Sequence, residues 1–239
     1  MKTTPFIILL ALLTFLTAQH SRLTFFDRVD VFLQQYVKNG LVDYRSILKN
    51  PGQLNQLVEE IRQFDLNTLT TPEQEQAFWI NTYNILVIKG IIAHYPLNSP
   101  LDVPGFFKSI RYPVGGQQLT LDEIENIRLR ERFNAPRVHF VLVCAARGCP
   151  PISDHAYRPE HLEQQMEQRA KNVLNNPRFV KIDEPTKTVY LSEIFKWFKS
   201  DFEGNGKSVV DYINRYRNTP IPFDFRIQYM KYDWNLNTF

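Results

Sequence analysis

The sequence predicts an α+β fold: a single domain in which helices surround a buried central helix and a small, mainly antiparallel sheet. Residues 72–91 are apolar on nearly all sides, which is typical of a helix inside a core. Short β-type segments lie in the second half of the chain. They are a buried strand at 137–144, a hairpin at 179–182 and 188–191, and a strand at 225–234. No internal repeat or linker-like tract divides the chain.

The composition is that of a globular protein with a sizeable core. Hydrophobic residues make up 44% and aromatic residues 13% of the 239 residues, which excludes a disordered chain. The 28 Lys and Arg nearly balance 25 Asp and Glu, so we expect no nucleic-acid partner. Two Cys exclude a four-thiolate zinc site, and the five His form no close ligand pair. We therefore expect no metal and no cofactor.

The N-terminal segment has the pattern of a secretory signal peptide. Lys2 precedes an apolar run at 6–16, and the small residue Ala18 follows it. The run is shorter than the roughly 20 residues of a spanning helix. We expect cleavage after Ala18, a domain at 19–239 without a membrane span, and a periplasmic or secreted location. An uncleaved anchor is the alternative.

The first half of the chain contains the clearest helix signals. Thr24 precedes a periodic segment that runs to about Lys38, and a second helix is predicted near 51–64. The central helix begins at Thr71, followed by Pro72 and a capping Gln74.

Two asparagines lie inside this central helix. Asn81 and Asn84 are poor helix-interior residues, so each amide is expected to have a hydrogen-bonding partner.

The middle of the chain has weaker periodicity. Residues 95–118 are rich in Pro and Gly and predict irregular structure with a turn at the Gly pair. Thr120 and Glu123 form a capping box for a helix to about Arg130. Further helices are predicted at 159–174, 192–198 and 209–216.

Reactive side chains are densest at residues 137–151. This segment holds both cysteines, Cys144 and Cys149, together with His139 and Arg147. A nucleophilic cysteine needs a thiolate stabilised by a cation or a histidine. Cys149 lies in the predicted loop and is expected to be the more accessible thiol, whereas Cys144 ends an apolar strand. A local disulfide and two inert thiols remain open alternatives.

Several motifs, taken in order, resemble the DUF547 family over about Leu41 to Asn237. They are Phe-Trp-Ile-Asn-Thr-Tyr-Asn at 78–84, Leu-Thr-Leu-Asp-Glu-Ile-Glu at 119–125, Arg-Val-His-Phe at 137–140, Cys-Pro-Pro at 149–151, the segment 189–202 and Tyr-Asp-Trp-Asn-Leu-Asn at 232–237. The family name states no activity, so the resemblance implies a grouping only. Asn126 stands where the family often has a His. The family's motif residues correspond here to Trp79, Asn81, Tyr83, Asn84, Glu125, Arg137, His139, Cys144, Cys149 and Pro150.

Two hypotheses for function follow from these residues. The first is a thiol-dependent hydrolase or acyl-transfer enzyme, with Cys149 as nucleophile, His139 as base or acid, and Glu125 orienting the histidine. Its ligand would be a small molecule or peptide, and its substrate-binding residues would be Trp79, Asn81, Asn84, Arg137 and Cys144.

The alternative is a non-catalytic module of the cell envelope that binds a ligand or a protein. The same polar residues would then form a buried network that specifies the fold. Exposure separates the two hypotheses, because an enzyme needs a cleft that reaches these side chains.

Overall fold

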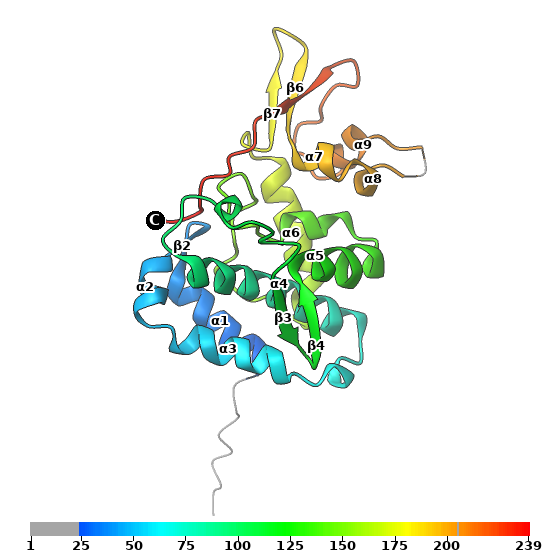
Figure 1. Cartoon of the computed structure of the whole chain (residues 1–239). Helices are drawn as coiled ribbons and strands as arrows, with labels where there is room; N and C mark the ends of the chain where they lie inside the picture. The colour runs from blue at the N-terminus through cyan, green and yellow to red at the C-terminus, as the bar shows by residue number, and fades with distance from the viewer. Residues whose placement is uncertain (1–23, 205) are drawn as a thin grey trace, which may run out of the picture.

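The longest helix, α4 (Pro72–His94), lies at the centre of a helical body (Figure 1). The computed structural model describes residues 24–204 and 206–239. Every side chain from Ala77 to Ile88 is buried. Thr71 and Gln74 form the capping box at its start, as the sequence predicted. The buried central helix of the predicted α+β fold is therefore confirmed.

Two N-terminal helices cover one side of α4. α1 (Phe25–Tyr36) and α3 (Gly52–Gln63) match two predicted helices, and the short α2 (Tyr44–Lys49) between them was not predicted. The rings of Phe25, Phe64 and Phe78 meet at centroid distances of 4.2 to 5.7 Å. Aromatic packing of this kind stabilises the body around α4. The minimal strands β1 (Val37–Lys38) and β2 (Leu41–Val42) pair between α1 and α2.

The middle segment contains a hairpin that the sequence analysis assigned to irregular structure. β3 (Arg111–Val114) pairs with β4 (Gln117–Thr120) in antiparallel register around Gly115 and Gly116. Both glycines have positive φ, 53° and 80°, so the turn at the Gly pair is confirmed. Pro113 within β3 concealed the strand pattern.

The predicted helix after Thr120 forms, with an unusual geometry. α5 (Leu121–Glu123) continues as the π-helical segment η3 (Ile124–Glu131). A π-helical stretch is rare and is found preferentially near functional sites.

The predicted strand at 137–144 is wrong. The chain forms a 3-10 helix, η4 (Pro136–Phe140), and then continues without regular structure, although residues 138–143 are all buried. A short apolar run indicates burial but does not by itself distinguish a strand from other buried structure. The backbone here bonds to a side chain of α4 in place of a neighbouring strand.

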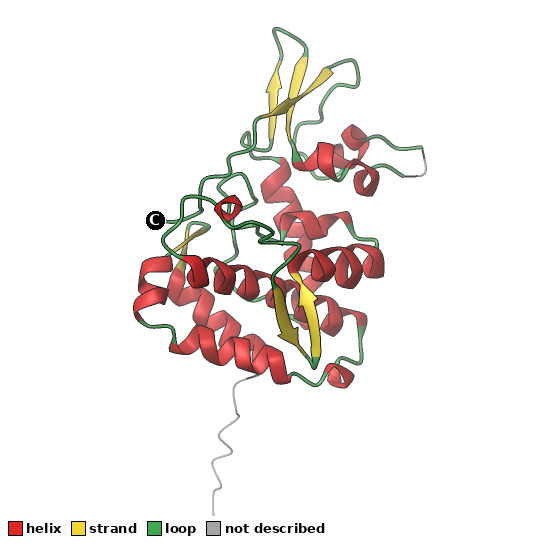
Figure 2. Cartoon of the chain, viewed as in Figure 1, coloured by secondary structure: helices red, strands yellow, loops and turns green. Residues whose placement is uncertain are grey.

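The C-terminal part carries the largest sheet, which projects from the helical body (Figure 2). After η5 (Pro159–His161) and α6 (Leu162–Leu174) come the antiparallel strands β5 (Val180–Asp183) and β6 (Thr188–Ser192), as predicted. β7 (Arg226–Met230) pairs with β6 in parallel. The sheet content is thus small and mainly antiparallel, but within residues 24–204 and 206–239 it is divided among three separate sheets.

Short helices lie between β6 and β7 in the chain. They are α7 (Ile194–Trp197), α8 (Lys199–Phe202) and α9 (Val209–Asn214). After β7 the chain returns to the body, where the Tyr44 hydroxyl donates to Oδ1 of Asn237 at 2.7 Å. Among the residues described, no helix combines the length and apolarity needed to cross a membrane. The predicted signal peptide at 1–18 lies outside the described residues.

Candidate functional site

A cleft of about 500 Å³ lies between residues of the helical body and residues of the C-terminal part. Its wall combines residues of α4, η3, η4, α7, the segment after β7, and the loop at 141–158 that carries both cysteines, called the cysteine loop below. It is lined by Tyr83, Phe107, Lys108, Asp122, Glu125, Asn126, Arg130, His139, Leu142, Cys144, Cys149, Pro150, Ile194, Trp197, Phe198, Tyr232 and Trp234. The three residues predicted to be catalytic, Cys149, His139 and Glu125, therefore line one cleft, and so does Cys144.

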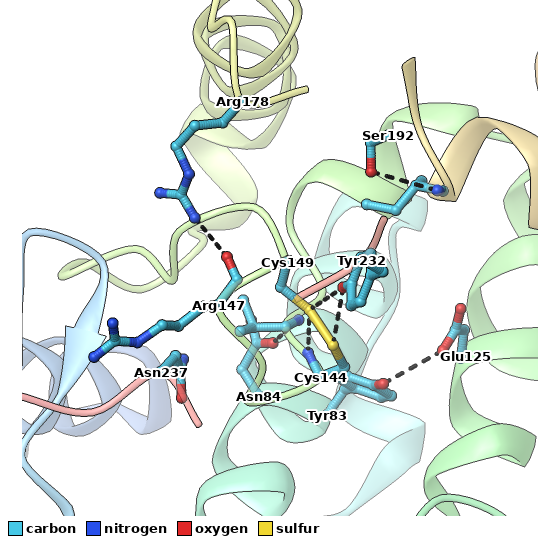
Figure 3. The surroundings of a disulfide bond; sticks show 12 residues. Tyr83, Asn84, Glu125, Cys144, Arg147, Cys149, Arg178, Ser192, Tyr232 and Asn237 are labelled. Atoms are coloured by element: carbon cyan, nitrogen blue, oxygen red, sulfur yellow. Dashed lines mark hydrogen bonds between the residues drawn. A yellow bond between two sulfur atoms is a disulfide. The ribbon is translucent and has the colours of Figure 1, made fainter. Parts of the chain in front are cut away.

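The two cysteines form a disulfide on the cleft wall (Figure 3). Cys149 is buried, with 6% of its surface exposed, whereas Cys144 is half-buried. This order of exposure is the reverse of the predicted one. Because Cys149 is disulfide-bonded, it is no free thiolate, and the expected nucleophile is absent from this state. The disulfide, one of the alternatives left open, is instead an electrophile toward thiolates.

Two hydrogen-bond donors lie next to the sulfur of Cys149. The backbone N–H of Cys144 and the hydroxyl of Tyr232 each lie 3.0 Å from Sγ of Cys149. The same hydroxyl lies 3.2 Å from Sγ of Cys144. Both donors would stabilise negative charge on the Cys149 sulfur.

Glu125 lies on another part of the cleft wall, next to Tyr83 (Figure 3). The Tyr83 hydroxyl donates to Oε2 of Glu125 at 3.3 Å. Burial raises the pKa of Glu125 to about 7, although the charge of Arg130 opposes the shift. Glu125 can therefore accept or donate a proton near neutral pH. It does not orient His139, contrary to the prediction.

Asp201 of α8 is the residue that orients His139. Nε2 of His139 lies 2.7 Å from Oδ2 of Asp201, and the Phe198 ring stacks on the imidazole at 4.0 Å. Arg130 binds the same carboxylate through Nε at 2.7 Å and Nη2 at 2.8 Å.

The charges of this group follow from its surroundings. Burial lowers the pKa of His139, against the influence of Asp201, so the ring is neutral at pH 7 and donates through Nε2. Burial alone would raise the pKa of Asp201, but hydrogen bonds from His139 and Arg130 hold it well below its usual value. The carboxylate is therefore charged and fixes the imidazole.

Asn81 and Asn84 point to the backbone rather than into the cleft. Asn81 donates to the carbonyl of Tyr157 at 2.7 Å and accepts from its N–H at 3.0 Å. Asn84 donates to the carbonyl of Val141 and accepts from the N–H of Val143, both at 3.0 Å. The partners expected for these amides exist, and they leave neither amide available to a ligand.

Trp79 and Arg137 also lie outside the cleft lining. Trp79 is 2% exposed and packs edge-on against Phe78. Arg137 forms an ion pair with Glu163 of α6 at 2.6 Å. The geometry therefore gives these two residues structural contacts and does not bring them to a ligand.

The cleft contains aromatic side chains that the sequence analysis did not select. Trp197, Tyr232 and Trp234 meet with ring centroids 4.8 to 5.9 Å apart. Tyr232 and Trp234 belong to the motif that closes the chain, and Trp197 and Asp201 belong to the motif segment at 189–202. These motifs were the sequence signal from which Trp197, Asp201, Tyr232 and Trp234 could have been selected. Nothing in the motifs indicated that their segments lie against the cysteine loop.

We find no metal-binding site in the described parts of the chain. No group of three or more His, Cys, Asp or Glu within residues 24–204 and 206–239 could hold a metal ion.

Comparison with models of protein families identifies the middle of the chain. The family model described as "Protein of unknown function, DUF547" matches residues 66–174. This segment includes α4, η3, His139 and both cysteines. No curated protein and no solved structure matches the chain. The resemblance recognised from the motifs is thereby confirmed for residues 66–174.

Proposed function

Since residues 66–174 belong to DUF547, a family of undefined function, we propose from the geometry of the cleft that this chain performs thiol–disulfide exchange. The reactive group is the Cys144–Cys149 disulfide. One observation carries the proposal: the disulfide lines a cleft, Cys144 is the more exposed of its two residues, and Sγ of Cys149 has two hydrogen-bond donors.

The exchange begins at Cys144, the more exposed of the two cysteines. A substrate thiolate attacks Sγ of Cys144, the S–S bond breaks, and its electron pair passes to Sγ of Cys149. The leaving thiolate is stabilised by the N–H of Cys144 and the hydroxyl of Tyr232. A second substrate thiolate then attacks the substrate sulfur of the mixed disulfide. Cys144 leaves as a thiolate, so the substrate is oxidised by two electrons and the protein becomes a dithiol.

Proton transfer is assigned to Glu125. Each incoming thiol must lose a proton, and a carboxyl with a pKa of about 7 accepts it readily at neutral pH. Glu125 lines the same cleft as both sulfurs.

A thiol hydrolase has less support from the geometry. Its base would have to contact the nucleophile, but Nε2 of His139 is bonded to Asp201, and the donor at Cys149 is Tyr232. A protein that exchanges disulfides also suits the predicted periplasmic or secreted location, because disulfides persist in oxidising compartments. N-terminal sequencing of the processed protein would test this location.

The test is a redox titration of the purified, folded protein in thiol–disulfide buffers. Trapped thiols are counted by mass spectrometry, and circular dichroism follows the fold. We expect a potential above about −250 mV, in the range of exchange proteins, together with oxidation of a reduced, unfolded model protein. A disulfide that stays intact below about −300 mV while the protein remains folded would identify a structural bond and overturn the proposal. The Cys144→Ala/Cys149→Ala double variant is the inactive control.

A second variant tests the leaving-group argument. Tyr232→Phe removes the hydroxyl donor from Cys149 and keeps the ring. We expect exchange with a small thiol to slow several-fold, because the leaving thiolate becomes more basic. Tyr190→Phe, on β6 and away from the cleft, is the matched control. Equal rates in both variants would show that Tyr232 does not assist the reaction.

A further inference from the structure

An aromatic corner, formed by Trp197, Tyr232 and Trp234, borders the disulfide. Tyr232 contacts both indoles at 4.8 Å and both sulfurs through its hydroxyl. Trp197 is 45% exposed although it lines the cleft. A large apolar surface held open beside a reactive group is typical of a ligand-binding wall.

The remaining wall adds further apolar side chains between its polar and charged ones. Phe107, Leu142 and Ile194 line it together with Phe198 and Pro150. Burying a large apolar side chain of a ligand against such a surface is favourable in free energy.

The charged groups give no advantage to an anionic ligand. Lys108 is balanced by Asp122 on the same wall, and the guanidinium of Arg130 is bound in a bidentate pair by Asp201. Glu125 adds further negative charge when it is ionised. A small thiol that carries carboxylates therefore finds no excess of positive charge here.

We propose, resting on the thiol exchange proposed above, that the substrate is a cysteine of an extended or unfolded polypeptide with large apolar neighbours. The aromatic corner binds a neighbouring aromatic or aliphatic side chain while the substrate sulfur reaches Cys144. The cleft of about 500 Å³ has the size of sites that enclose a short segment of a ligand.

The experiment compares three thiols as reductants of the oxidised protein. They are a blocked, uncharged pentapeptide with cysteine between tryptophan and leucine, the same peptide with cysteine between two serines, and glutathione. Each rate is divided by the rate with 2-mercaptoethanol at equal thiolate concentration. We expect the apolar peptide to react at least tenfold faster than the serine peptide, and glutathione to be slowest.

Binding is measured separately from exchange. The apolar peptide with serine in place of its cysteine cannot react, so its binding is read by isothermal titration calorimetry. In Trp197→Ala we expect weaker binding and at least a fivefold smaller rate ratio for the apolar peptide. Phe223→Ala, which removes an aromatic ring that is 74% exposed and outside the cleft, is the control.

The outcomes separate the two proposals. Exchange at equal normalised rates with all three thiols would overturn the peptide preference and leave thiol exchange standing. A protein inert to every thiol would overturn thiol exchange itself. A rate ratio that falls equally in Trp197→Ala and Phe223→Ala would remove the aromatic corner from recognition.

Discussion

At the scale of single residues, the charge of the site depends on whether Glu125 is protonated. Glu125 has a pKa of about 7 because burial disfavours its charge, whereas the pKa of a glutamate in the unfolded chain is about 4.5. Between these two values the folded protein binds more protons at this residue than the unfolded chain does. The contribution of Glu125 to the free energy of unfolding therefore falls as the pH rises from about 4.5 to about 7.

The variant Glu125→Gln tests this sign. It keeps an acceptor for the hydroxyl of Tyr83 and removes the cost of a buried charge. At pH 8 we expect the variant to be more stable than wild type by about 1–2 kcal/mol. The gain is no larger because the carboxyl lines the cleft and is partly solvated. At pH 4, where Glu125 is protonated, we expect the two proteins to be nearly equal in stability. Urea unfolding at pH 4, 6 and 8 measures the difference. Glu184→Gln, on the exposed hairpin turn, should show no such pH trend, and a pH-independent gain in Glu125→Gln would contradict the assignment.

At the scale of elements, local patterns predicted the parts that local forces determine. Thr71 and Gln74 predict the start of α4, because a capping box is formed by residues close together in the sequence. The hairpin of β5 and β6 is predicted by alternating apolar and polar residues on both sides of a turn. The segment 138–143 was misassigned because its backbone bonds to Asn84, more than 50 residues earlier. No periodicity encodes such a partner.

The same limit applies to the site. Cys149, His139 and Glu125 were selected by residue type, and they do share a cleft. Their partners Tyr232 and Asp201 come from segments more than 60 residues away, so their roles could not be read from spacing.

Asn84→Leu should show the cost of losing a long-range backbone clamp. It leaves the buried carbonyl of Val141 and the buried N–H of Val143 without their amide partner. We expect a loss of about 2–4 kcal/mol in the free energy of unfolding, and faster hydrogen exchange at residues 141–144. Asn172→Leu, at an exposed position of α6, is the control and should change little. Unchanged exchange at 141–144 would mean that packing alone holds this segment.

At the scale of the whole molecule, the cleft exists because the C-terminal part docks onto the helical body. α8 contributes Asp201, which joins η3 through Arg130 and η4 through His139. After β7 the chain supplies Tyr232 to the cysteine loop and ends against β2, where the N–H of Val42 donates to the carbonyl of Asn237. The disulfide and the aromatic corner thus come from segments that only tertiary packing brings together.

Asp201→Asn tests whether this docking controls the cleft. The change keeps the shape but leaves Arg130 without its bidentate carboxylate and removes the charge that fixes His139. We expect a loss of about 2–4 kcal/mol at pH 7, because removing one partner of a partly buried pair leaves the other uncompensated.

The pH dependence of the loss has a definite sign. Because the pKa of Asp201 is depressed in the folded protein, its stabilisation is present above the unfolded value of 3.8 and is lost as the pH falls further. The gap between wild type and Asp201→Asn should therefore narrow in acid, below about pH 3.8. Urea unfolding at pH 7 and pH 3 measures it, with Asp224→Asn, an exposed partner of Lys187, as the control that leaves the midpoint unchanged. If Asp201→Asn unfolds like wild type at pH 7 and still binds the apolar peptide, the two parts are held by apolar packing alone. The cleft would then not depend on the ion pair.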